Sequence, residues 1–139
     1  MIKITVLALF GFATVALAED AKEAPKDAKL PPASTKTGLT FATDIKQIFD
    51  ASCVKCHSGE KAKAGLRLDS LENTLKGGKN GKDKILTVGD SAKSPVVKMI
   101  ARIGDPEGWM PPAHNKANIG PLTEEQVGIV RAWIDQGAK

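Results

Sequence analysis

Five consecutive residues, Cys53-Val54-Lys55-Cys56-His57, constrain this chain more than any other part of its sequence. A C-x-x-C-H motif is the attachment signature of a c-type haem. The two cysteines bond to the haem vinyl groups, and the histidine binds the iron from one side. Two intervening residues let the thiols reach two edges of one porphyrin while the next side chain points at its centre. The motif occurs once, so the sequence predicts one covalent haem c held by Cys53, Cys56 and His57.

Three other kinds of site also use a C-x-x-C pair. A thioredoxin-like redox dithiol is expected in a βαβ setting, which no part of this sequence indicates. A zinc site needs further ligands at suitable spacing, but the chain has no second C-x-x-C and only His57 and the distant His114. A structural disulfide between Cys53 and Cys56 needs no histidine at position 57. Haem attachment is the interpretation that uses all three residues.

The first residues have the composition of an export signal, which fits a haem that is attached outside the cytoplasm. Lys3 supplies a basic start, residues 4–17 form an apolar run, and Ala16-Leu17-Ala18 is an A-x-A cleavage site. The run is shorter than the ~20 apolar residues that span a bilayer. An uncleaved N-terminal anchor is the alternative. We expect a signal peptide over residues 1–18, export to the periplasm or the cell exterior, and no stable membrane insertion after cleavage.

The segment after the expected cleavage site has a different composition. Residues 19–39 are rich in Lys, Glu, Asp, Ala and Pro with little to bury, which predicts a disordered or linker segment. Residues 40–139 are enough for one small core, and we expect them to form a monohaem domain. The formal net charge of +4 is too weakly basic to indicate nucleic-acid binding.

Helical patterns dominate residues 40–139. Apolar periodicity and capping residues predict four helices, with N-caps at Thr43, Asp69, Ser94 and Thr123. The last helix is the clearest, because Gln126 completes a capping box and Gly137 provides a stop. A short strand is expected at residues 85–88. The result is a mostly helical domain whose long loops are unusual for an ordinary core but expected around a haem.

Three residues compete for the side of the iron opposite His57. Met110 lies between Trp109 and two prolines, which hold the backbone extended and present one thioether on a stiff loop. Met99 has the helical spacing of a core methionine. His114 is a good ligand chemically but has polar neighbours. Met110 is preferred, and a methionine sulfur raises the reduction potential, whereas a second histidine would lower it.

Other side chains have two interpretations each. Arg67, between two leucines, either pairs with a haem propionate or is a solvated arginine. Trp109 packs on the haem edge and donates its N–H, packs in the core, or does both. Four loop lysines either steer an acidic partner towards the haem or belong to a solvated loop: Lys76, Lys79, Lys82 and Lys84.

In their order along the chain, these motifs resemble the planctomycete-type cytochrome c domain. The resemblance covers about residues 40–139. The motifs that carry it are Cys53-x-x-Cys56-His57, Gly65-Leu66-Arg67-Leu68-Asp69, Gly77-Gly78, Ser94-Pro95, Met110-Pro111-Pro112 and Trp133-Ile134-x-x-Gly137-Ala138. It implies an all-α, class I cytochrome c-like fold in which the N-terminal helix crosses the C-terminal one. It also implies ligation by His57 and Met110, and one-electron transfer.

The expected function is therefore that of an electron carrier, not an enzyme, with transient redox protein partners. The alternative is a haem enzyme or small-ligand sensor whose sixth iron position opens to a gas or to peroxide. A cytochrome subunit docked permanently to a dehydrogenase is a third possibility. The sequence indicates no oligomeric state.

Overall fold

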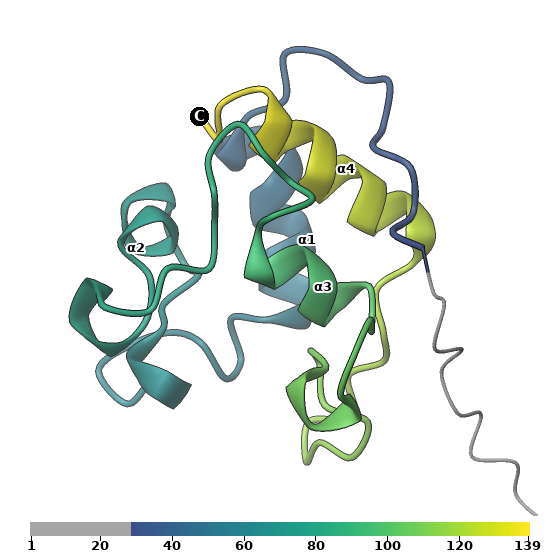
Figure 1. Cartoon of the computed structure of the whole chain (residues 1–139). Helices are drawn as coiled ribbons and strands as arrows, with labels where there is room; N and C mark the ends of the chain where they lie inside the picture. Colours follow the sequence, from purple (N-terminus) through teal and green to yellow (C-terminus); the bar gives the residue numbers. More distant parts are fainter. Residues whose placement is uncertain (1–28) are drawn as a thin grey trace, which may run out of the picture.

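The structure, a computed structural model, describes residues 29–139, and within them it contains helices and loops but no β-strand (Figure 1). The π-helical and 3-10 turns are labelled η, and the elements in chain order are η1 (Phe41–Ile45), α1 (Lys46–Ser52), η2 (Lys63–Gly65), α2 (Leu71–Lys76), η3 (Lys79–Gly81), α3 (Pro95–Ile100), η4 (Pro106–Gly108) and α4 (Glu124–Asp135). The all-α class is confirmed. The expected strand at residues 85–88 is wrong: Ile85 is buried in the core, and its carbonyl accepts the backbone N–H of Val96 in α3 at 3.0 Å.

The first helix begins earlier than its sequence pattern suggests. Thr40, not Thr43, is the N-cap, and its hydroxyl accepts the backbone N–H of Thr43 at 3.2 Å. The carboxylate of Asp44 in turn accepts the backbone N–H of Thr40 at 3.0 Å. These two bonds satisfy donors that the start of a helix otherwise leaves free. They fix η1, from which α1 runs on to the C-x-x-C-H motif.

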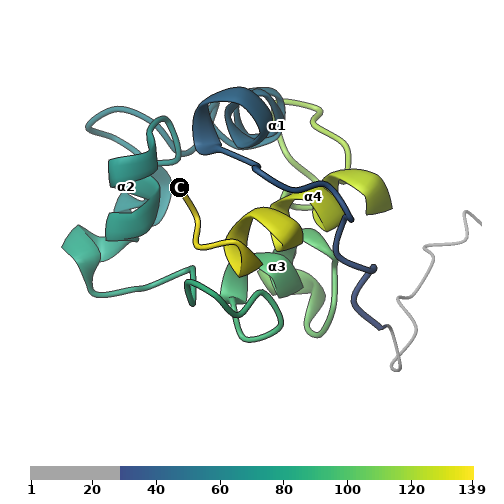
Figure 2. The same cartoon turned by 90° about the horizontal axis from the view of Figure 1, so that it is seen from above.

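The last helix is as the sequence predicts. Thr123 and Gln126 form a capping box, and Gly137 follows the helix with a φ of 102°. Trp133 is fully buried, and its ring centroid lies 6.1 Å from that of Phe41 in η1. Viewed from above, α4 lies between the η1–α1 segment and α3 (Figure 2). Contacts of α4 with both segments make it the centre of the main core.

Residues 29–39, named here the N-terminal strap, pack against α4. The backbone N–H of Ser34 donates to the carbonyl of Gly128 at 2.9 Å, and the Arg131 guanidinium donates to the carbonyl of Pro31. Leu39 is buried. This part of the expected linker is therefore ordered against the domain, because its few apolar residues and its carbonyl groups find partners on α4. The expected signal peptide and residues 19–28 lie outside the described residues.

The two short helices differ from their predicted capping in detail. The N-cap of α2 is Ser70 rather than Asp69, since the Ser70 hydroxyl accepts the backbone N–H of Asn73 at 3.2 Å. Ser94 stands at the N-cap of α3, but its hydroxyl donates to the carbonyl of Asp90 at 2.9 Å instead of capping the helix. No helix of residues 29–139 has the length and apolar character needed to cross a membrane.

Candidate functional site

The C-x-x-C-H motif extends the end of α1 by one turn. The backbone N–H of Cys53 donates to the carbonyl of Phe49 at 2.7 Å, which continues the helical bonding. The Cys53 carbonyl then accepts the backbone N–H groups of both Cys56 and His57, at 3.1 and 3.0 Å. Since these bonds curl the chain into a single turn, the side chains of Cys53, Cys56 and His57 line the same cavity.

The chain after the motif folds back onto it. The His57 carbonyl accepts the backbone N–H of Leu68 at 2.8 Å, and the Cys56 carbonyl accepts that of Lys63 at 3.0 Å. These bonds close the 57–68 loop and bring Leu66 and Leu68 to the cavity. The loop thus supplies an apolar wall beside the histidine.

The cavity is lined almost entirely by apolar side chains from five parts of the chain. Its lining residues are Ser52, Cys53, Cys56, His57, Leu66, Leu68, Ile85, Val96, Met99, Ile100, Met110, Pro111, Pro112, Asn115 and Ile119. The empty space among them is about 570 Å³ including the open mouth, of which about 50 Å³ can take the centre of a water molecule. The cavity is therefore a narrow slot with a mouth to solvent.

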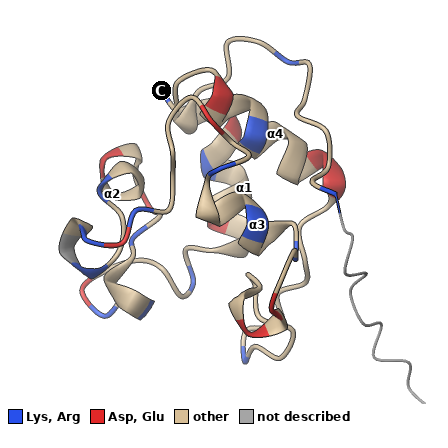
Figure 3. Ribbon diagram, in the orientation of Figure 1, with Lys and Arg blue, Asp and Glu red and all other residues tan. Residues whose placement is uncertain are grey.

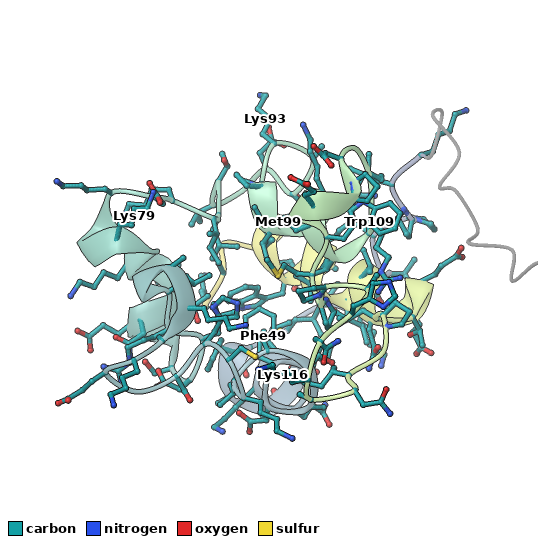
Figure 4. The ribbon with its side chains drawn as sticks, turned by 90° about the horizontal axis from the view of Figure 1, so that it is seen from below. Phe49, Lys79, Lys93, Met99, Trp109 and Lys116 are labelled. Carbon is teal, nitrogen blue, oxygen red and sulfur yellow. The ribbon has the colours of Figure 1, made fainter. Side chains whose placement is uncertain are left out.

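Both candidate methionines reach this slot. Met110, on the proline-flanked loop, is half-buried and packs against the core. Met99 does not have the core position that its helical spacing predicts, because it is half-buried and its side chain also lines the slot. In Figure 4 the Met99 side chain extends from α3 towards the interior. The slot therefore offers two thioethers.

The backbone around Met110 is held to α3. The backbone N–H of Met110 donates to the carbonyl of Met99 at 3.1 Å. This hydrogen bond ties the loop to the last turn of α3. The prolines that follow, Pro111 and Pro112, both line the slot, and the Met110–Pro111 peptide bond is cis. The loop thus presents Met110 from a fixed backbone.

Burial affects the titration of the attachment residues. It raises the pKa of the Cys53 thiol to about 12, and the neighbouring Cys56 adds to this shift. The pKa of His57 is lowered, mainly by burial, while the backbone of Leu66 and Lys63 opposes the change. A neutral imidazole is the form that binds a metal. Its Nδ1 atom is buried and makes no hydrogen bond in the structure.

The donor set fits a c-type haem better than the other candidates. Both thiols are free, so the expected alternative of a Cys53–Cys56 disulfide is not what the structure contains. Within residues 29–139, no group of three or more His, Cys, Asp and Glu side chains could hold a metal ion, as a zinc site would require. Two thiols, one imidazole and a thioether around an apolar slot are suited to attach a flat apolar cofactor and bind its iron.

Three of the residues considered at the sequence level do not line the slot. Arg67 is exposed and pairs with Asp69 at 3.1 Å. Trp109 is buried, and its indole N–H donates to the carbonyl of Gly104 at 3.2 Å, as a core tryptophan would. His114 is exposed and lines a separate polar groove.

Sequence reasoning missed Arg102 and Asn115. Asn115 lines the slot, and its side-chain oxygen and nitrogen hold the backbone of Ile119 at 2.9 and 2.8 Å. Arg102 follows α3 and contacts both neighbours of Met110. No short motif marks either residue. The only available signal was their closeness in sequence to Met110.

A scan against protein families matches residues 53–114 to the family described as Planctomycete cytochrome C. This match supports a planctomycete-type cytochrome c domain in this part of the chain. The match confirms the resemblance over the part of the chain from Cys53 to His114, which includes the haem motif and Met110, and not over the whole of residues 40–139. No curated protein and no solved structure matches the chain.

A cytochrome c domain implies a covalently attached haem c and haem-based electron transfer. The matched range contains nearly all of the residues that line the slot, whereas η1, α1 up to Ser52 and α4 lie outside it. The family pattern therefore coincides with the part of the cytochrome domain that surrounds the site.

Proposed function

We propose that the chain is a one-electron carrier with a single haem c, in a class I cytochrome c-like arrangement of helices and loops around it. The observation that supports this most is the apolar slot on which two thiols, an imidazole and two thioethers converge. When bound, haem supplies an iron that cycles between the ferric and ferrous states. The protein then has to hold, shield and tune that group.

Each donor has a distinct task in this proposal. Cys53 and Cys56 form the two thioether attachments, and His57 binds the iron through its imidazole. Met110 would supply the second protein ligand of the iron, and its thioether would favour the ferrous state. The aliphatic side chains of the slot exclude water. Exclusion of water stabilises the ferrous state, because its iron carries less positive charge than that of the ferric state. With His57 and Met110 both holding the iron, no substrate would reach it.

The composition of the slot favours a carrier over an enzyme. None of its lining residues is Asp, Glu, Lys or Arg, so apart from the attachment residues it has no group for acid or base chemistry. The alternative function, a haem enzyme or sensor for a gas or peroxide, requires the sixth position to open. Because two methionine side chains line the slot, a thioether is at hand to occupy the sixth position, which supports a closed site.

Partner contacts and location follow from the same proposal. Electron transfer needs only a brief encounter through a small surface near the haem edge, so we infer transient redox protein partners. Because c-type cytochrome domains are generally exported, we also propose that residues 1–18 direct export to the periplasm or the cell exterior.

The test is the intact mass and the spectrum of the protein made in a host with haem maturation machinery. We expect the mass of the mature chain plus one haem, and a ferrous spectrum that carbon monoxide changes only slowly. An apoprotein mass with a Cys53–Cys56 disulfide would contradict the haem proposal. A haem that binds carbon monoxide rapidly would favour the sensor or enzyme.

A further inference from the structure

We propose that Arg102 is a positioning residue that holds the Met110 thioether at the iron. This inference rests on the proposed function, in which Met110 is the sixth ligand. Arg102 does not line the slot and would not touch the haem iron itself. Its effect passes through the two residues that flank Met110.

The Arg102 guanidinium contacts both of those neighbours. Its central carbon lies 5.5 Å from the centroid of the Trp109 ring, within the range of a cation–π interaction. Its Nη2 donates to the carbonyl of Pro111 at 3.2 Å. A charged donor makes a stronger hydrogen bond than a neutral one. One side chain thus fixes the residue before Met110 and the residue after it.

The backbone conformation at Arg102 is one that an arginine rarely adopts. The N–H groups of Arg102 and Ile103 donate to the carbonyls of Met99 and Lys98 at 3.3 and 3.0 Å, the bonding pattern of a Schellman motif that ends α3. Arg102 is the residue in the left-handed conformation, with a φ of 55°, where glycine is usual. An arginine costs stability there, and its buried Nε makes no hydrogen bond in the structure.

Two other bonds tie Trp109 and Met110 to α3 and the residues that follow it, whereas beyond Met110 the Asn115 side-chain amide donates to the Pro112 carbonyl at 2.9 Å, a bond within the loop itself. The Trp109 indole N–H donates to the Gly104 carbonyl, and the Met110 N–H donates to the Met99 carbonyl. Of the side-chain hydrogen bonds in the described part of the chain, the one from Arg102 is the bond that holds the Pro111 carbonyl. Removing the guanidinium should therefore let the segment after Met110 move away from the slot.

The test compares Arg102→Gln with Arg131→Gln in the haem-loaded protein. Arg131 is a matched control, because it is also half-buried and its guanidinium also donates to a proline carbonyl, that of Pro31, but on the α4 side of the molecule. Arg102→Gly is a second variant that keeps the Schellman turn, since glycine is favoured at that position. Any effect of Arg102→Gly therefore comes from loss of the side chain and not from loss of the turn.

Three measurements report on Met110: the sulfur-to-iron charge-transfer band of the ferric protein, the rate of carbon monoxide binding to the ferrous protein, and hydrogen exchange of the Met110 amide. We expect both Arg102 variants to bind carbon monoxide about tenfold faster than the unmodified protein, which corresponds to ~1.4 kcal/mol. The charge-transfer band should weaken, and the Met110 amide should exchange faster. Arg131→Gln should leave all three unchanged.

Equal carbon monoxide rates and Met110 amide exchange in the Arg102 and Arg131 variants would overturn the positioning role. Should Arg102→Gln fail to fold, Arg102→Gly decides the matter by the same measurements. Met110→Ala separates this inference from the proposed function. If Met110→Ala leaves the charge-transfer band intact, the ligand assignment fails, whereas if it removes the band and the Arg102 variants match the unmodified protein, only the role of Arg102 fails.

Discussion

The α4 side of the molecule and the slot side are built differently. Around α4, large side chains such as Trp133, Phe49 and Ile134 are completely buried. Around the slot, Met99, Met110 and several other lining residues are only half-buried, although part of its wall belongs to the same buried core: Leu68, Ile85, Val96 and Ile100. Buried apolar area is the main source of folding free energy. The comparison therefore separates a core that stabilises the chain from apolar walls that become covered when a cofactor lies between them.

The difference extends to how each region is bonded. The strap, η1 and α4 are joined by bonds between residues far apart in sequence, such as Gln136 to the carbonyl of Lys36 at 2.8 Å. The slot is bounded by loops that bond mainly within themselves, as Asn115 does with Ile119. The loops of the site are hydrogen-bonded within themselves, and the core beneath them is joined by hydrogen bonds between distant residues. Such a site can accept a large cofactor without unfolding the domain.

The largest effect should come from Met110→Ala, on the iron rather than on stability. Loss of the thioether should remove the sulfur-to-iron charge-transfer band, lower the reduction potential and let carbon monoxide bind the ferrous protein. Met99→Leu is the matched control, because it removes the other thioether of the slot while conserving volume, at a cost below ~1.5 kcal/mol. Ferric spectra and redox titration of both variants test this.

Met99→Leu is a strict control because the Met99 side chain lines the slot as well and could itself reach the iron. We expect Met99→Leu to keep the band. A band that survives Met110→Ala and is lost in Met99→Leu would assign the ligand to α3 instead of the loop. Loss of the band only in His114→Ala would contradict both assignments.

A matched pair of isoleucines tests the comparison directly. Ile134→Ala removes a completely buried side chain of α4 and should lower the free energy of unfolding by ~2–5 kcal/mol. Ile119→Ala truncates the same residue type at the half-buried wall of the slot and should cost less than half as much. Denaturant unfolding of the haem-loaded variants measures both. Equal losses would mean that the two regions share one core.

The strap should give a smaller effect. A Cβ added at Gly128 would lie 2.7 Å from the carbonyl oxygen of Pro32, closer than the two atoms can approach. Gly128→Ala should therefore displace the strap from α4 and cost ~1–3 kcal/mol. Gly120→Ala is the control, since its Cβ would have nothing within 4 Å. If both variants unfold at the same denaturant concentration, the strap does not contribute to stability.

The features that could be predicted from the sequence are those with local signals. The α4 helix was predictable because its capping box and apolar periodicity are local signals that agree with its burial. The haem motif was equally clear, because its chemistry lies in five adjacent residues. Both helix starts that were misplaced, at Thr40 and Ser70, lie within three residues of their expected caps.

The rest depended on contacts between distant residues. The polar composition of the strap predicts a linker, whereas its bonds to Gly128 and Arg131 join it to a helix about a hundred residues away. Met99 was assigned to the core because periodicity identifies an apolar face but not whether a slot lies against it. Arg102 could not be found because its role depends on the folded path of the Met110 loop.

The smallest effect is expected at the lysines around α2, which lie in a region of mixed charge (Figure 3). Lys79 pairs with Asp83 at 3.3 Å, and Lys84 donates to the carbonyls of Leu75 and Lys76 at the end of α2. Two of these lysines are thus already paired or hydrogen-bonded within the loop. Because pairs this exposed contribute little to stability, any function of these lysines should appear in kinetics.

If these lysines steer an acidic partner, Lys79→Glu combined with Lys82→Glu should slow reduction by such a partner at low salt. The effect should shrink as salt rises, because the Debye length falls to ~8 Å at physiological ionic strength. Lys36→Glu changes the same kind of charge on the strap, away from this loop, and should have less effect. Stopped-flow reduction at several salt concentrations measures all three lysines. Equal rates for the double variant and the unmodified protein at low salt would leave these lysines as a solvated loop, because steering must act where screening is weakest.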